Sequence, residues 1–455
     1  MSARHIIHVC FLAMLLFSKA LAQSTTAPVI QSEDDLFSTL LTFKSDQLAT
    51  ASELLTRYHN HISTNLWDKL IEKAWGSYSH DDSSQTFFLL ETAKLVAERL
   101  QNEELVGTTH SYIGSTHRHD HNTEAAIKSY LESASIFDRA GFQTELVRPL
   151  SELGSLYLYI EDYQKAKQYS VKSLTIANKV TGNNLTTGTD RLLYGAATAL
   201  KVLGHVSKQE GSYEQAIAHF SQALDLFQQA SSTDPNRGYE IVECLKRIGQ
   251  VHRIVGDHVR ALTYYQKALA AADTLPDKET LAAVLISMSN LYLEQRDYAS
   301  ATVLLNRSLQ IALQQKNRNH ADVATIYLNL GVSALRQGNY AEARKSFELS
   351  LENAERAGRK DTIIAAHEGI GLLLRENGDY ARAMESLEKG WALVDQPDNP
   401  TRKAELLWCK AEVHYAMGNF AEAIASAEKA VEVAKAFRFP NVTYLASTIL
   451  TLFCH

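Results

Sequence analysis

Small, apolar and aromatic residues recur along this chain at one fixed spacing. In each copy a small residue is followed twelve positions later by Ala or Thr, and seven positions further on by Ala, Ser or Gly. The clearest copy has Gly331, Ala343 and Ser350 at these three positions. The first small residues of the nine copies are Ala74, Gly114, Gly154, Gly204, Gly249, Ser289, Gly331, Gly371 and Ala411. An uninterrupted spacing of this length indicates stacked supersecondary units.

Each copy divides into two halves at a short polar turn, such as Gln337–Asn339 or Met417–Asn419. Gly and Asn in these turns favour the left-handed backbone that ends a helix. On either side of the turn the apolar residues step by three and four, which is the period of an amphipathic helix. The small residues let two helix axes come close, and an aromatic just after the turn, such as Tyr340, is expected to fill the wedge between them. Each copy is therefore predicted to be a helical hairpin whose apolar face is buried by the next hairpin.

This pattern resembles the tetratricopeptide repeat. One copy matches that family's pattern position for position, with Leu203, Gly204, Tyr213, Ala216, Phe220 and Ala223. The early Trp of the family pattern is mostly Leu here, and its closing Pro is absent. From Gly114 onward the copies are 40 to 50 residues apart, which is longer than the common unit of about 34 residues. Kinesin light chains and the front halves of bacterial proteins with a caspase-like (CHAT) domain are similar in this respect. The resemblance implies an all-α fold, a right-handed α-solenoid of helix-turn-helix hairpins.

The repeats divide the chain into four segments. We expect a signal peptide over residues 1–22, a linker and N-terminal helical lead-in over 23–66, nine repeats over 67–440, and a trailing helix over 441–455. The trailing helix fits the first half of a tenth repeat and is apolar on most sides. A solenoid normally ends with a helix that is polar on its outer face. Two interpretations follow: the helix docks on a partner or on a second copy of the chain, or the chain is a shortened version of a longer protein.

The first residues have the pattern of a secretory signal peptide. Arg4 precedes the apolar run Val9–Phe17, and Ala20–Ala22 provides a small-x-small cleavage site. We therefore expect export, to the periplasm or outside the cell, with cleavage after Ala22. The apolar run is shorter than the roughly 20 residues that span a bilayer, so no membrane span is expected.

The rest of the composition argues against catalysis and against nucleic-acid binding. The net charge of −7 gives no general affinity for nucleic acid. No phosphate-binding Gly loop, Ser nucleophile elbow or zinc-protease motif is present. His117, His119 and His121 are weak metal candidates, but the repeat register places them around an exposed turn. We predict a non-enzymatic protein without a cofactor or a resident metal.

The resemblance implies that partners bind along the first helix of each hairpin, on the side opposite its packing face. With the small residue counted as position eight, that side carries positions two, five, nine, twelve and thirteen. The candidate groove residues are Arg148, Lys201, His205, Lys208, Lys246, Gln250, Arg253, Asn290, Leu328, Val332 and Leu335. A further, acidic zone follows at Glu368, Glu405 and Glu412.

Each zone of this groove has two interpretations. The cations are suited to a carboxylate or an acidic segment, or they serve only to solvate the inner helices. The apolar residues mark an interaction surface, or they are covered within the solenoid. Asn290 stands where the family's clamp asparagine lies, but its partner lysine is replaced by Ile286, so a full carboxylate clamp is not expected.

Two functions remain. The first is an exported scaffold that binds a protein or peptide partner in the groove. The alternative is the sensor half of a CHAT-like protease system whose effector domain is missing or separate.

Overall fold

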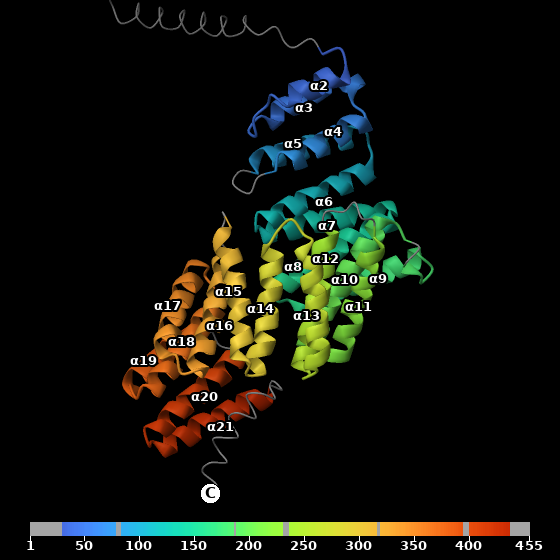
Figure 1. Cartoon of the computed structure of the whole chain (residues 1–455). Coiled ribbons are helices and arrows are strands. Elements are labelled where there is room, and N and C mark those ends of the chain that lie inside the picture. Colours follow the sequence, from blue (N-terminus) through green and yellow to red (C-terminus); the bar gives the residue numbers. More distant parts are fainter. Residues whose placement is uncertain are drawn as a thin grey trace, which may run out of the picture. The chain divides into compact units, whose positions relative to one another are not determined.

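The computed structural model describes residues 30–78, 83–185, 188–230, 236–315, 319–394 and 400–436. Within these residues every regular element is a helix (Figure 1), which confirms the predicted all-α solenoid class. The predicted signal peptide and the predicted trailing helix lie outside the described residues. The chain forms two compact units, residues 1–232 and residues 233–455. We call them unit 1 and unit 2.

Unit 1 contains the helical lead-in and four hairpins. The lead-in consists of α2 (Glu33–Leu40), α3 (Leu48–Arg57) and the 3-10 helix η1 (His59–His61). The hairpins pair α4 (Thr64–Gly76) with α5 (Ser84–Arg99), α6 (Glu103–His119) with α7 (Thr123–Ala140), α8 (Gln143–Tyr159) with α9 (Tyr163–Val180), and α10 (Asp190–Gln209) with α11 (Tyr213–Gln229).

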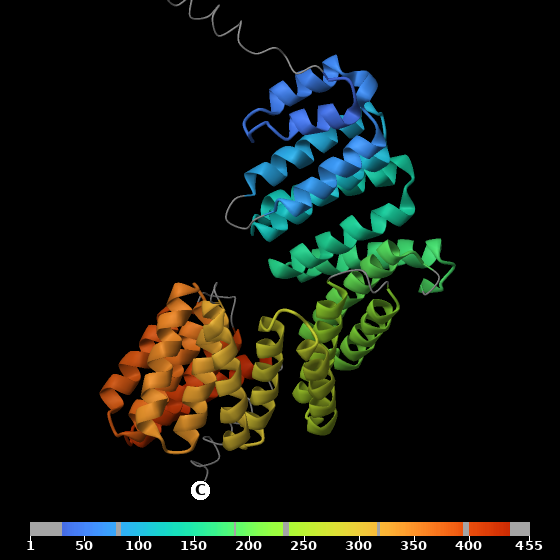
Figure 2. The same cartoon turned by 45° about the horizontal axis from the view of Figure 1, so that its top comes forward.

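Unit 2 contains five hairpins. They pair α12 (Arg237–Ile254) with α13 (His258–Asp273), α14 (Glu279–Glu294) with α15 (Tyr298–Gln314), α16 (His320–Arg336) with α17 (Tyr340–Arg356), α18 (Lys360–Glu376) with α19 (Tyr380–Ala392), and α20 (Pro400–Ala416) with α21 (Phe420–Ala436). Within each unit the hairpins stack in chain order (Figures 1 and 2). In each hairpin the first frame residue lies in the first helix, and the other two lie in the second helix.

The repeating small residues form the packing frame of both units. All three frame positions of every hairpin are buried. At Gly204 an added Cβ would lie 2.8 Å from the ring of Phe220, and at Gly331 it would lie 2.6 Å from the ring of Phe347. Only a glycine allows such an approach, because real Cβ contacts do not occur below 3.0 Å. The frame therefore sets how closely the two helices of a hairpin pack.

The wedge between the helices is filled by a different side chain from the one predicted. It is the residue sixteen positions after the small residue, as with Phe220 and Phe347, and both of these are fully buried. The aromatics just after the turn are more accessible, since Tyr340 is 38% exposed and Phe420 is 53% exposed. The expectation that the turn aromatic fills the wedge is wrong at these positions, because the residue that opens the second helix lies at the end of the hairpin rather than between its axes.

In several hairpins, a serine hydroxyl of the second helix donates a hydrogen bond to a backbone carbonyl of the first helix. Ser133 Oγ donates to the Gly107 carbonyl oxygen at 2.8 Å, and Ser173 Oγ donates to that of Val147 at 2.8 Å. In unit 2, Ser308 Oγ donates to the Ala282 carbonyl oxygen at 3.0 Å, and Ser350 Oγ donates to that of Ala324 at 2.8 Å. Each acceptor lies 26 residues before its serine. The third frame position thus accepts Ser where its hydroxyl can bind this carbonyl, and it is Ala or Gly in the other hairpins.

The turns end the first helices in the predicted way. Gly338 has φ 75°, and the next residue, Asn339, donates its N–H to the Ala334 carbonyl oxygen at 2.9 Å. This left-handed residue satisfies a carbonyl that the helix end leaves without an internal donor. Among the described residues, no helix is both long enough and apolar enough to cross a membrane.

Candidate functional site

The first helices of neighbouring hairpins touch one another within each unit. In unit 1, α8 contacts α10, and in unit 2 the first helices α12, α14, α16, α18 and α20 form a contacting series. The Asn329 amide of α16 donates to Asn290 Oδ1 of α14 at 2.7 Å. Positions two, five, nine and twelve of these helices therefore share one surface in each unit. We call this surface the first-helix face.

The predicted cationic residues of unit 1 lie half-buried on this face. Arg148 belongs to α8, and Lys201, His205 and Lys208 belong to α10. The Lys201 ammonium lies 6.0 Å from the ring centroid of Phe227, and the His205 ring meets that of Phe220 edge-on at 5.1 Å. These contacts anchor the α10 side chains against the second helix of their own hairpin.

The predicted cationic residues of unit 2 are held in ion pairs on α12 and α14. The Lys246 ammonium lies 2.6 Å from a Glu243 carboxylate oxygen, and Arg253 pairs with Glu294. Burial by itself would raise the pKa of Glu243, but Arg247 and Lys246 outweigh it and hold that pKa well below its usual range. The Arg247 guanidinium also donates to Gln250 Oε1 at 3.0 Å. The basic zone expected from sequence is thus divided between the units, and its unit 2 part is neutralised internally.

The apolar residues of the candidate groove are partly packed within unit 2 and partly accessible to solvent. Leu328, Val332 and Leu335 are half-buried, and they pack against a buried cluster that includes Phe347 and Leu373. Both sequence interpretations apply in part: one side of each residue is covered within the solenoid, and the other remains on the first-helix face. Asn290 is engaged by Asn329, so its amide oxygen already accepts a hydrogen bond.

In the acidic zone Glu368 is buried, whereas Glu405 and Glu412 are half-buried. Arg402 Nη1 lies 2.6 Å from Glu405 Oε2 and 3.5 Å from Glu368 Oε2. Glu368 Oε1 is buried without a hydrogen-bond partner among the described residues. Burial raises the pKa of Glu368 well above its usual range, and the Arg402 charge only partly opposes this effect. A carboxyl in this setting favours its protonated form.

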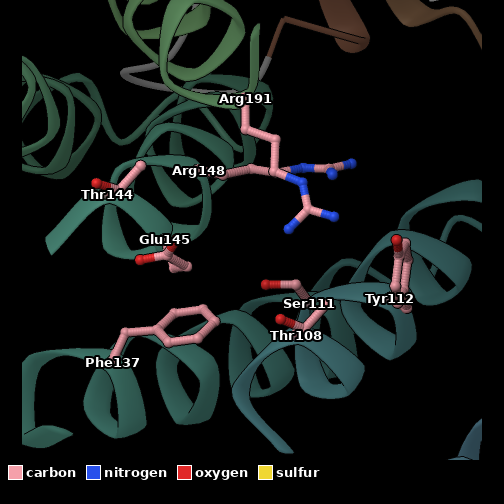
Figure 3. Close-up of a pocket in the computed structure, with 8 residues that line it drawn as sticks. All are labelled: Thr108, Ser111, Tyr112, Phe137, Thr144, Glu145, Arg148 and Arg191. Atoms are coloured by element: carbon pink, nitrogen blue, oxygen red, sulfur yellow. The ribbon is translucent and has the colours of Figure 1, made fainter. Parts of the chain in front are cut away.

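A pocket opens in unit 1 beside Arg148 (Figure 3). Its cavity volume is about 30 Å³, enough for one or two water molecules. The lining residues come from α6, α7, α8 and α10, and they are Thr108, Ser111, Tyr112, Phe137, Thr144, Glu145, Arg148 and Arg191. Thr108, Ser111 and Arg148 stand at positions two, five and two of their repeats, so the pocket belongs to the first-helix face.

Both arginines of this pocket lack an anionic partner among the described residues. The Arg148 Nε atom is buried and has no hydrogen-bond acceptor among the described residues. Arg191 is exposed and forms no ion pair within the described part of the chain. In Figure 3 the two arginine side chains lie next to each other above Ser111 and Thr108; one guanidinium group points toward Ser111 and the other points sideways.

Arg191 is a pocket residue that the repeat pattern does not indicate, because it lies before the frame of its repeat. A signal was available in the interval of 50 residues between Gly154 and Gly204. The longer interval gives α10 a length of 20 residues, whereas α8 has 17. Arg191 lies in the first turn of this longer helix, where it lines the pocket together with residues of α6 and α8.

The three weak metal candidates, His117, His119 and His121, have different surroundings. The ring of His117 lies 4.5 Å from that of Phe87, and the ring of His119 lies 6.3 Å from that of Trp75. His121 is exposed in the turn with φ 58°. Within the described segments, no three His, Cys, Asp or Glu side chains are grouped so that they could hold a metal ion.

Comparison with known proteins agrees with the repeat frame. Two family profiles, both described as Tetratricopeptide repeat, match residues 105–179, 241–314 and 322–394, and residues 197–229 and 404–437, together more than half of the chain. Protein KINESIN LIGHT CHAIN-RELATED 3 of Arabidopsis thaliana is 23% identical over 297 residues, which are 63% of this chain and 43% of that protein. Tonsoku-like protein of Drosophila melanogaster is 20% identical over 395 residues, 69% of this chain and 27% of that protein. The chain thus spans less than half the length of either relative.

Two solved structures share the fold. The apo form of the quorum sensor NprR from B. thuringiensis has a TM-score of 0.55 at 17% identity, covering 80% of this chain and 98% of that one. A STAND protein with a tetratricopeptide repeat sensor from Pyrococcus horikoshii has a TM-score of 0.51 at 16% identity, covering 79% of this chain and 52% of that one. With its nine-hairpin frame and these matches, the chain belongs to the tetratricopeptide repeat family.

Proposed function

We propose that this protein is a non-enzymatic scaffold that binds a protein or peptide partner along its first-helix face. The observation that carries the proposal is the separation of two surfaces on the same helices. The frame positions are buried in every hairpin, whereas the residues at positions two, five, nine and twelve stay mostly half-buried on a face shared by neighbouring helices. A series of such helices offers an extended peptide repeated contacts along its length.

The first-helix face of unit 1 suits acidic side chains of a partner, and that of unit 2 suits apolar side chains. Arg148 and the α10 cations supply positive charge in unit 1, and Leu328, Val332 and Leu335 supply apolar contact in unit 2. Charged groups on such a surface set orientation and the rate of association more than affinity. The apolar residues are then expected to contribute most of the binding energy.

Peptide selection by the full mature chain tests this function. The chain, starting at Gln23, is incubated with a random peptide array, and binding to the selected peptides is measured for two triple variants. Arg148→Glu, Lys201→Glu and Val332→Glu change the first-helix face. Lys128→Glu, Lys267→Glu and Val303→Glu make the same changes at exposed positions of the second helices α7, α13 and α15.

We expect the first-helix variant to lose at least tenfold in affinity for the selected peptides, while the second-helix variant keeps the affinity of the unchanged chain. Circular dichroism of both variants verifies that helicity is preserved. The proposal fails if the chain selects no peptide above background, or if only the second-helix variant loses binding.

Export is part of this proposal and rests on the sequence pattern of residues 1–22. A charged residue, a short apolar run and a small-x-small site are the features that signal peptidases read. Expression of the whole chain in a bacterial host, followed by N-terminal sequencing of the recovered protein, tests it. The expected first residue is Gln23. Recovery of the uncleaved chain from the cytoplasm contradicts export.

The second candidate function is the sensor half of a CHAT-like protease system. It is favoured by the fold shared with a protein described as carrying a tetratricopeptide repeat sensor. In this case the first-helix face would receive a signal for a separate effector. Capture from the native organism followed by mass spectrometry distinguishes the two: recovery of a caspase-like protease supports the sensor, and recovery of other partners contradicts it.

A further inference from the structure

We propose that the pocket of unit 1 is a carboxylate-binding subsite, in which Arg148 and Arg191 hold a carboxylate of the bound peptide. The inference rests on the proposed peptide-binding function and assigns one part of the first-helix face to one chemical group. The carboxylate comes from the peptide's C-terminus or from an Asp or Glu side chain, and the experiment below separates these sources.

The unsatisfied donors of the pocket argue for an anionic ligand. Arg148 Nε is buried without an acceptor among the described residues, and leaving a buried donor unsatisfied is unfavourable, more so when the group is charged. Arg191 brings a second guanidinium without an ion-pair partner in the described part of the chain. A carboxylate accepts paired N–H donors from a guanidinium in a matched planar geometry.

Hydroxyl groups complete the donor set. Thr108, Thr144 and Tyr112 line the pocket, and their hydroxyls form no hydrogen bond with any other described residue. The Ser111 hydroxyl differs, since Ser133 donates its only proton to the Gly107 carbonyl and Ser111 must therefore donate to Ser133 at 2.8 Å. The lone pairs of Ser111 remain free to accept a peptide N–H beside the bound carboxylate.

The net charge of the pocket favours a carboxylate over a phosphate. Two arginines and Glu145 give the lining a net charge of about +1, which complements a monoanion. In Figure 3 the Glu145 carboxyl group lies on the Phe137 side of the opening. A dianionic phosphate would meet more repulsion from Glu145 than a monoanionic carboxylate would.

Arginine side-chain NMR on the full mature chain tests this inference directly. The ¹⁵N-labelled Nε–H resonances of Arg148 and Arg191 are followed during titration with four probes. N-acetylglycinate represents a peptide C-terminus, N-acetylglutamic acid α-amide represents an acidic side chain, N-acetylglycinamide is the neutral control, and inorganic phosphate is the competing anion.

We expect both arginine resonances to shift in a saturable way with at least one of the two carboxylate probes, and the stronger of these identifies the source. Arg191→Gln should weaken that binding about tenfold, and because Arg191 is exposed this change should leave the fold intact. Lys128→Gln removes the same charge from an exposed site on α7 and should change nothing. Resonances that do not move, that respond equally to N-acetylglycinamide, or that respond more strongly to phosphate overturn the inference.

The peptide-array experiment distinguishes failure of the carboxylate subsite from failure of the proposed function. If the chain selects peptides that bind the first-helix face but the arginine resonances do not respond, the function stands and the subsite is refuted. If the carboxylate probes bind while the chain selects no peptides, the pocket takes a carboxylate that does not belong to a groove-bound peptide, and the inference is also refuted.

Discussion

Units 1 and 2 share one packing frame, but Lys246 and Arg253 of unit 2 differ from Arg148 of unit 1 in the partners of their positive charges. In unit 2, Lys246 and Arg253 are paired with Glu243 and Glu294 on the same or the neighbouring first helix. In unit 1, Arg148 lies with its Nε buried and without an acceptor among the described residues. Cations on the same face of the first helices therefore have different roles.

Whether a cation is paired within the chain decides whether it stabilises the fold or is available to a ligand. A paired cation on a first helix already has its anion, so a ligand would have to displace that anion before it could bind. An unpaired guanidinium beside free hydroxyls gains its first anion when the ligand arrives. Cation density along a groove is thus a poor guide to binding, and pairing within the fold is a better one.

We expect the largest loss of stability from substitutions in the packing frame that the two units share. Gly204→Val in unit 1 and Gly331→Val in unit 2 each force a side chain against a buried ring, Phe220 or Phe347. Overpacking of this kind should lower the free energy of unfolding by about 3 kcal/mol in both. Urea denaturation of the full chain measures it.

Gly76→Val provides the control, since an added Cβ at Gly76 meets nothing within 4 Å. Its effect should stay at about 0.5 kcal/mol or below. A large loss at only one of the two frame glycines would show that the units do not share one packing rule.

The second-largest effect concerns the buried carboxyl group of Glu368 in unit 2. Because the pKa of Glu368 is raised from its ordinary value of 4.5, the folded chain holds this proton more tightly than the unfolded chain. Stability contributed by this group is present below pH 4.5 and is lost as the pH rises toward the folded pKa. Glu368→Gln should remove this dependence and stabilise the chain at pH 8 by on the order of 1–2 kcal/mol.

Urea denaturation at pH 5 and pH 8 measures this slope. Glu385→Gln on the exposed surface of α19 is the matched control, because Glu385 pairs with Lys389 at 2.8 Å in solvent. Identical pH slopes in the two variants would show that Glu368 does not titrate as its burial requires.

A smaller effect tests whether the serine bonds are equivalent in both units. Ser173→Ala in unit 1 and Ser308→Ala in unit 2 each remove one buried hydroxyl bond to a carbonyl 26 residues earlier. Each should cost about 1 kcal/mol in the free energy of unfolding. The reverse change, Ala223→Ser, should recover part of this energy by forming the same bond in the fourth hairpin. A cost in one unit alone would contradict an equivalent frame.

The fold was predictable from the sequence because its frame is strictly periodic. Gly331, Ala343 and Ser350 repeat a spacing that only one architecture satisfies, and every equivalent residue is buried. The wedge residue was harder to identify, since Tyr340 and Phe347 are both aromatic and only the hairpin geometry shows which of them is enclosed.

The candidate site was predictable only in part. Lys246 and Glu243 are three residues apart on one helix, and this sequence spacing indicates that they can form an ion pair. The pair of Arg253 with Glu294 joins residues 41 apart on two helices, and its formation depends on how α12 and α14 pack. Arg191 escaped prediction for a similar reason: it lies outside the repeat frame and joins the pocket through the extra length of α10.

The central claim is that unpaired first-helix cations bind a partner and paired ones stabilise the fold. Calorimetric titration of an array-selected acidic peptide into Arg148→Gln and Arg253→Gln, with urea denaturation of both, tests it most directly. We expect Arg148→Gln to weaken affinity about tenfold without lowering the free energy of unfolding. We expect Arg253→Gln to retain the affinity and to lower the free energy of unfolding by about 0.5 kcal/mol. Loss of affinity in Arg253→Gln with full affinity in Arg148→Gln would contradict the central claim.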